Sequence, residues 1–362
     1  MATNTATRAY RERFRDAFGR AYFRRFADSV VSSIGIGTYL GDPTDAVDDR
    51  YQRAIVEAVE NGINVIDTAI NYRHQRSERV VGAAVSAAAI EREELLIATK
   101  GGFIPFDGSQ PDDPGQYIRT EYLDPGIIDR SALVRGSHCL APAFIDDQLD
   151  RSLKNLGLET VDLYYVHNPE TQLEVHDRTT VYDRLEATFE QLERRAAAGD
   201  IRNYGVASWN AFRVHEEHQH YLSLAEVIGR ARSAARTVGN DASHFRAIQL
   251  PFNVEMADAF TVTAQSGPDG EQSALWFAQE ADLDVFTSAS IGQGALAEEL
   301  PPSVAAELNG DSTVQRAINF ARSAPGVTAA LVGMSRPAHV TENIAAGTFA
   351  PMGADAFDAV FE

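Results

Sequence analysis

The sequence predicts an α/β fold, a closed (β/α)8 barrel of the TIM type that is preceded by a β-hairpin. Short apolar segments alternate with amphipathic helical segments along the chain, as they do in parallel βαβ units. The apolar segments have almost no polar interruptions, which is typical of strands covered on both faces. Eight such pairs extend over about 310 residues, somewhat more than the usual barrel length of about 250.

The predicted strands are short and rich in Val, Ile, Leu and aromatic residues, and they occupy residues 30–36, 63–67, 95–99, 161–166, 202–207, 246–250, 284–288 and 327–332. Helical periodicity predicts helices over residues 50–61, 77–89, 143–156, 181–198, 219–237, 272–282, 313–323 and 337–346. A doubly wound sheet is the alternative fold. Its G-x-G-x-x-G fingerprint is not matched after the first strand, where the third glycine, Gly41, comes one position late. The barrel is therefore preferred.

Two segments depart from this alternation. Residues 22–33 resemble two short strands joined at Ala27-Asp28, a hairpin that would close one end of the barrel. Residues 101–141 form a long loop after the third strand, on the side of a barrel where active sites lie. We therefore expect an N-terminal extension over 1–21, a barrel domain over 22–349 with the 101–141 loop shaping the substrate site, and a C-terminal tail over 350–362.

The composition is that of a globular protein, with 44% hydrophobic residues, 23% charged residues and a formal net charge of -20. This acidic balance argues against nucleic acid or an anionic membrane as a partner, because phosphate binding needs clustered Lys and Arg. The one basic cluster, Arg8 to Arg25, is interpreted as a solvated helix or strand. Cys139 is the only cysteine, so no internal disulfide is expected.

Neither a signal-peptide pattern nor an apolar run of about 18 residues is present, and we expect a cytoplasmic protein. The oligomeric state is not readable from the sequence. The acid excess suggests a halophilic adaptation, in which salt screens self-repulsion. If so, the midpoint of thermal unfolding should rise between low and molar salt; a midpoint that stays constant or falls would contradict this hypothesis.

Four polar residues follow three successive predicted strands. Asp67 ends the second strand and Tyr72 lies five residues later, Lys100 follows the third strand, and His167 follows the fourth. In a barrel these strand ends meet at one mouth. A Lys ammonium lowers the pKa of a nearby phenol, an Asp keeps the Lys charged, and a His can orient a substrate oxygen, so the group suits proton transfer to a carbonyl.

Each of these residues has a structural explanation when it is taken alone. Asp commonly caps helices and Lys extends along apolar surface to solvent, so only the combination is specific. Lys100 is also one of only two Lys in a chain with 32 basic residues. A metal-dependent hydrolase or isomerase would need further His, Asp or Glu at the strand ends, and the His residues of the segment HEEHQH at 215–220 lack the zinc-protease spacing. No metal site is predicted.

The sequence resembles the aldo-keto reductase family. The similarity lies in GIGTYLG at 35–41, INVIDTAINYRHQRSERVVG at 63–82, IATKGG at 97–102, VDLYYVHNPE at 161–170, IRNYGVASWN at 201–210, AIQLPFN at 247–253 and ALVGMSRPAHVTEN at 330–343. The resemblance implies the (β/α)8 fold, a nicotinamide cofactor, and reversible reduction of an aldehyde or ketone. It places the catalytic residues at Asp67, Tyr72, Lys100 and His167, with Tyr72 as the general acid.

The resemblance also implies a cofactor site at Gly37, Thr38, Tyr39, Asp67, Ser208, Gln249, Ser288, Ile291, Gln293, Gly294, Gly333, Ser335, Arg336, His339, Glu342 and Asn343, and substrate contacts at Tyr39, Phe103, His167 and Trp209. The chain departs from the family at the nicotinamide end, where Ala207-Ser208 replaces a Ser-Asn pair and Ser288 replaces a stacking Tyr. Gly333 and His339 replace basic phosphate ligands. Arg336 remains as a ligand for a 2′-phosphate, which favours NADP(H), with NAD(H) as the alternative.

One rival function comes from relatives of this family that bind the cofactor and act through a partner protein. The chain would then be a regulatory or redox-sensing subunit of the same fold with little turnover. The intact set of four catalytic residues favours an enzyme.

Overall fold

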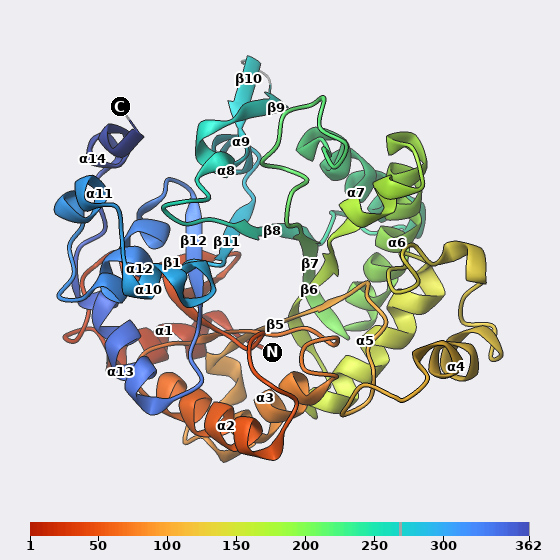
Figure 1. Cartoon of the computed structure of the whole chain (residues 1–362), viewed down its shortest axis with the longest axis horizontal. Coiled ribbons are helices and arrows are strands. Elements are labelled where there is room, and N and C mark those ends of the chain that lie inside the picture. The colour runs from red at the N-terminus through yellow and green to blue at the C-terminus, as the bar shows by residue number, and fades with distance from the viewer. Residues whose placement is uncertain (268–269, 362) are drawn as a thin grey trace.

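The computed structural model describes residues 1–267 and 270–361, and it confirms the (β/α)8 barrel (Figure 1). Eight parallel strands close in the order β11-β12-β3-β4-β5-β6-β7-β8. Their bounds are β3 Ile34–Gly37, β4 Val65–Asp67, β5 Leu96–Gly101, β6 Val161–His167, β7 Ile201–Ala207, β8 Phe245–Pro251, β11 Asp284–Ser288 and β12 Val327–Gly333. Each strand is buried over most of its length, as the apolar runs predict.

Helices surround this barrel in Figure 1, and each predicted helix is present within a few residues of its expected bounds. They are α2 Asp45–Glu60, α3 Arg76–Ala87, α5 Pro142–Leu156, α6 Arg178–Ala198, α7 Leu224–Val238, α9 Ala274–Glu280, α12 Thr313–Ser323 and α13 Pro337–Ala345. Capping chemistry sets several ends. The Ser223 and Ser312 side chains accept backbone N–H groups at the starts of α7 and α12, and Gly199 ends α6 at a φ of 91°.

The predicted hairpin is confirmed and closes the N-terminal end of the barrel. Strands β1 (Phe23–Phe26) and β2 (Ser29–Ser32) pair antiparallel around Ala27. Phe26 packs edge-on against Phe286 of β11, in a cluster of apolar side chains from the barrel strands. The strand predicted over 30–36 is thus two strands, because residues through Ser32 pair with β1 whereas β3 pairs with β12 and β4.

The basic N-terminal segment is not merely solvated. It forms helix α1 (Asn4–Arg13), which packs against the barrel through Tyr10. The Tyr10 hydroxyl donates a hydrogen bond of 2.6 Å to the carbonyl of Val59, and the Ala2 N–H donates one of 2.6 Å to Asp162. The C-terminal segment is also docked, since Phe357 of α14 (Ala354–Asp358) is buried against Phe320. The domain boundaries stay predictions.

The 101–141 loop contains short helical pieces, namely α4 (Pro114–Ile118), η2 (Arg119–Leu123) and η3 (Arg130–Ala132). Cys139 at its end is fully buried, and burial raises the pKa of its thiol to about 11, so a reactive thiol is not indicated. Five further elements were not expected: α8 (Asp258–Thr261), the hairpin of β9 (Thr263–Gly267) and β10 (Gly270–Ser273), α10 (Ala295–Glu298) and α11 (Pro302–Glu307). No helix in the described parts is long and apolar enough to cross a membrane.

Candidate active site

Three of the four predicted catalytic side chains form a hydrogen-bonded cluster at the C-terminal ends of β4 and β5. The Nζ atom of Lys100 donates to Oδ2 of Asp67 at 2.6 Å, to the carbonyl of Thr68 at 2.9 Å and to the hydroxyl of Tyr72 at 3.2 Å. Lys100 is fully buried and Asp67 is nearly so. The ammonium therefore has three fixed acceptors, one of which is the phenol oxygen.

Tyr72 is placed by an irregular turn that follows β4. The next three residues, Arg73, His74 and Gln75, all have left-handed φ angles, of 47°, 57° and 68°. The Arg73 side chain is buried, forms an ion pair with Asp48 and donates to the carbonyl of Asp42. This anchoring turns Arg73 away from the barrel mouth and leaves the Tyr72 ring facing it.

The pKa of Tyr72 differs from the expectation that the nearby Lys ammonium lowers it. Burial raises the pKa of Tyr72, and the opposing effect of Lys100 does not fully offset it, so the phenol is protonated at neutral pH. Burial alone would lower the pKa of Lys100, but Asp67 and Tyr72 raise it above its usual range. The ammonium thus stays charged and the phenol keeps its proton, which is the state that a proton donor needs.

His167 faces the cluster from the end of β6. Its ring lies 5.9 Å from the ring of Tyr72 and 5.2 Å from that of Phe103, centroid to centroid. Burial, followed by the positive charge of Lys100, holds the pKa of His167 well below its usual range, so the imidazole is neutral. Its Nδ1 atom is buried and has no hydrogen-bond partner among the described residues.

The main chain of His167 is held by a residue that sequence reasoning missed. Nε2 of the buried His138 lies 2.8 Å from the His167 carbonyl oxygen, and the side-chain amide of Gln172 lies 2.8 Å from His138 Nδ1. Burial lowers the pKa of His138 to about 4, so this ring donates from Nε2 and accepts at Nδ1. The sequence carries no signal that would have found this contact, because His138 lies in a loop without periodicity.

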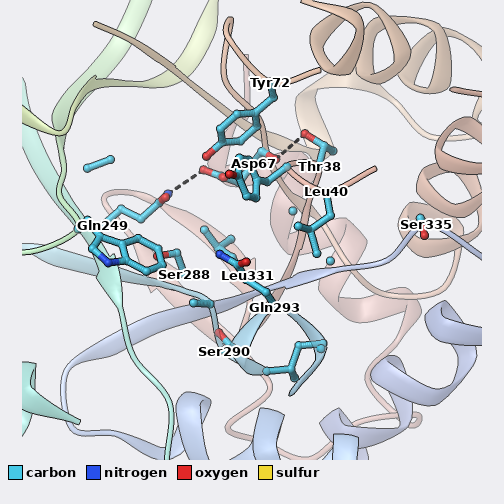
Figure 2. A pocket seen from close by; sticks show the side chains of 18 of the residues that line it. Thr38, Leu40, Asp67, Tyr72, Gln249, Ser288, Ser290, Gln293, Leu331 and Ser335 are labelled. Atoms are coloured by element: carbon cyan, nitrogen blue, oxygen red, sulfur yellow. Dashed lines mark hydrogen bonds between the residues drawn. The ribbon is translucent and has the colours of Figure 1, made fainter. Parts of the chain in front are cut away.

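The cluster opens into a cavity of about 620 Å³ at the barrel mouth (Figure 2). Nearly all predicted site residues line it: Gly37, Thr38, Tyr39, Asp67, Tyr72, Phe103, His167, Ser208, Trp209, Gln249, Ser288, Ile291, Gln293, Gly294, Gly333, Ser335, His339, Glu342 and Asn343. Two predicted residues do not. Lys100 is buried beside Tyr72, and Arg336 is exposed at the start of α13, next to the cavity-lining Ser335.

The cavity also has lining residues outside the predicted catalytic, cofactor and substrate sets, namely Leu40, Tyr51, Asn71, Asn168, Ala207, Ala289, Ser290, Ala297, Val314 and Leu331. Asn71 and Asn168 are direct neighbours of Tyr72 and His167 in the sequence, and that adjacency was the available signal. No Lys or Arg is among the described residues that line the cavity. The described residues also contain no group of three or more His, Cys, Asp or Glu that could hold a metal ion.

Hydrogen bonds fix the polar side chains at the floor of the cavity. Nε2 of Gln249 donates to Oδ1 of Asp67 at 2.7 Å, and the Thr38 hydroxyl donates to the Asp67 carbonyl at 3.2 Å (Figure 2). The Ser208 hydroxyl donates to Glu170 at 3.1 Å and accepts from the N–H of Ala211 at 2.7 Å. Gln249 Oε1 and a lone pair of the Ser208 hydroxyl therefore remain as hydrogen-bond acceptors.

Comparisons with known proteins agree with this architecture. The protein is similar to a Schizosaccharomyces pombe protein provisionally named as a voltage-gated potassium channel subunit beta, with 23% identity over 88% of this chain and 85% of the relative. It is 26% identical to the NADH-specific methylglyoxal reductase of Escherichia coli over 55% of this chain and 54% of that enzyme. Its fold matches an aldo-keto reductase from Klebsiella pneumoniae, solved with NADPH, at a TM-score of 0.59, with 18% identity and 93% of each chain covered.

The family model described as "Aldo/keto reductase family" matches residues 33–224, which is more than half of the chain. That segment begins just before β3 and extends to the start of α7, so it contains all four residues of the predicted catalytic set. The protein belongs to the aldo/keto reductase family.

Proposed function

We propose that the protein reduces an aldehyde or a ketone to an alcohol with NAD(P)H, and that Tyr72 is the general acid. The observation that carries this proposal is the Lys100 ammonium, which is fully buried and donates to both Asp67 and the Tyr72 hydroxyl at the floor of an open cavity. A buried Lys that is placed against a phenol favours the phenolate that remains after proton transfer.

The side chains have separate roles in the proposed reaction. The reduced nicotinamide supplies the hydride when it is bound. The Tyr72 hydroxyl gives its proton to the carbonyl oxygen, and Lys100 stabilises the phenolate that this leaves, at an N–O distance of 3.2 Å. Asp67 keeps Lys100 charged. The neutral His167 orients the carbonyl oxygen as a hydrogen-bond donor from Nε2.

The residues present fit a dinucleotide. A cavity of about 620 Å³ has the size of a small-molecule site, for which volumes of about 300–1,000 Å³ are usual. Gln249 Oε1 and the Ser208 hydroxyl offer acceptors to a carboxamide N–H2 group, and Trp209, 38% exposed and lining the cavity, offers an aromatic surface in the absence of the stacking Tyr. The loop of Ile291, Gln293 and Gly294 and the start of α13 would hold the phosphates and the adenosine.

We favour NADP(H) over NAD(H) because Arg336, at the N-terminal end of α13, would attract a 2′-phosphate together with the helix dipole. Arg336→Ala is expected to lower kcat/KM for NADPH about tenfold and to leave that for NADH nearly unchanged, since one charge-assisted contact is worth roughly 1.5–3 kcal/mol. Steady-state kinetics with both cofactors measure this. If wild type has the same kcat/KM with NADPH and with NADH, and Arg336→Ala leaves the two values equal, Arg336 does not bind the 2′-phosphate.

The substrate is proposed to be a small carbonyl compound that packs against aromatic side chains. Tyr39, Phe103 and Trp209 line the cavity together with His167. Asn168 is available to bond a hydroxyl group of such a substrate.

The regulatory alternative draws support from the similarity to the fission yeast protein named after a channel subunit. A regulatory subunit would bind the cofactor tightly, would not consume it with any carbonyl compound, and would be indifferent to Tyr72→Phe. Cofactor oxidation with a broad panel of aldehydes and ketones separates the two functions.

A further inference from the structure

The buried carboxylate of Glu170 has no role in the reaction proposed above. Glu170 lies in the 3-10 helix η4 (Pro169–Glu174), directly after β6, and is 3% exposed. Its Oε1 atom accepts hydrogen bonds from the N–H groups of Trp209 and Asn210, at 2.8 and 3.0 Å, and from the Ser208 hydroxyl at 3.1 Å. Three donors on a single oxygen are the arrangement of a carboxylate anion.

Glu170 stands apart from the other buried carboxylates that the structure describes. Four of these form an ion pair with an Arg or Lys side chain, namely Asp67, Glu94, Asp162 and Asp284, and Glu193 lies 2.6 Å from Nδ1 of His244. Glu78 has no such partner, but both of its oxygens are hydrogen-bonded, to Thr99 and Asn155. Glu170 has neither an ion pair within the described residues nor a partner for its buried Oε2 atom.

A buried carboxylate without a positive partner is costly in a protein interior, and the three hydrogen bonds to Glu170 offset only part of that cost. Burial raises the pKa of Glu170 in spite of the hydrogen bonds that oppose the rise. The groups that bind its Oε1 atom connect it to the cavity, because Ser208 and Trp209 both line the cavity wall. A positively charged ligand in that cavity would lie on the far side of these residues from Glu170 and would lower the cost of its charge.

We propose that Glu170 is the electrostatic partner of the positively charged, oxidised nicotinamide ring, and that it strengthens binding of NAD(P)+ relative to NAD(P)H. The proposal rests on the function proposed above, since the same cavity must hold the cofactor. Glu170 does not line the cavity, so it acts through its charge and through the Ser208 hydroxyl that it orients. It is a positioning residue, not one that contacts the reacting atoms.

The test is a pair of dissociation constants, for NADP+ and NADPH, measured by protein fluorescence on wild type and Glu170→Gln. Gln has the same shape and keeps an acceptor for the three donors. We expect the Kd for NADP+ to rise roughly tenfold and that for NADPH to change less than about twofold, because the substitution removes a buried negative charge that would attract only the oxidised, cationic ring. Glu170→Asp, which keeps the charge, should preserve the wild-type ratio of the two constants.

A matched control is Glu159→Gln, which removes a charge from an exposed residue just before β6, at the opposite end of that strand from the cavity. It should leave both constants unchanged. If Glu170→Gln weakens both cofactor forms equally, or neither, Glu170 is only a structural support and the proposal is wrong. If wild type binds neither form, the proposed function fails instead.

A measurement on wild type keeps the proposal falsifiable should the Glu170 variants not fold. With ADP-ribose added to fill the rest of the site, the cationic 1-methylnicotinamide should bind at least severalfold more tightly than neutral nicotinamide, measured by competition with NADPH. Equal binding of the two fragments, tighter binding of the neutral one, or binding of neither would overturn the role of Glu170.

Discussion

Tyr72→Phe is expected to lower kcat by about 10³-fold, within the range of roughly 10²–10⁴ that a positioned general acid contributes. The substitution removes the hydroxyl that the Lys100 ammonium contacts at 3.2 Å, and with it the proposed proton donor. The Kd for the cofactor should stay within about twofold of wild type, because the ring that forms this part of the cavity wall is kept. Steady-state kinetics and a fluorescence titration measure the two effects separately.

Tyr10→Phe is the matched control for the loss of a Tyr hydroxyl. Its hydroxyl donates to the carbonyl of Val59 and accepts from the N–H of Gly62, and it belongs to α1, away from the cavity-lining residues. We expect this variant to lose about 1–3 kcal/mol of stability and no activity, because two buried hydrogen bonds are lost without any change at the site. A Tyr72→Phe enzyme that retains wild-type kcat would remove Tyr72 from the role of general acid.

Lys100→Met is expected to abolish measurable turnover and also to lower the free energy of unfolding by about 3–5 kcal/mol. The first effect follows because Tyr72 loses the charge that stabilises its phenolate. The second follows because Asp67 is left buried without a countercharge among the described residues and keeps the hydrogen bond from Gln249. Activity assays and urea unfolding measure the two effects.

The double variant Lys100→Met/Asp67→Asn separates the loss of activity from the loss of stability. Removing both charges should restore most of the lost stability and none of the activity, since a buried pair is dispensable for folding when both partners are replaced. Lys154→Met, on the exposed side of α5, is the control for the loss of a Lys and should stay within about 0.5 kcal/mol of wild type. A Lys100→Met protein with wild-type activity would contradict the proposed mechanism.

Much of the fold was predictable because it depends on local patterns. Continuous apolar runs indicated parallel strands, and helical periodicity placed most helix ends within a few residues of their positions in the structure. The convergence of Asp67, Lys100 and His167 followed from one topological rule, that successive parallel strands end at the same mouth. Periodicity could not show that residues 30–36 are shared between the hairpin and the barrel, because every residue of that segment is buried and apolar alternation is therefore absent.

The remaining features of the site depend on contacts between distant segments. The net rise in the pKa of Tyr72 is a balance between burial and Lys100 that only the packed site decides. His138 reaches His167 from a loop whose path has no periodic signature. Glu170 is one of many acidic residues in the sequence, and its isolation from any cation among the described residues becomes visible only when its neighbours are placed.

The central claim is tested most directly by following the hydride itself. Wild type and Tyr72→Phe are incubated with a panel of aldehydes and ketones and NADPH deuterated at C4 of the nicotinamide, and the alcohol products are analysed by mass spectrometry. We expect one deuterium on the former carbonyl carbon with wild type and a rate about 10³-fold lower with the variant. Bound NADPH that is never consumed, or equal label transfer by both proteins, would contradict it.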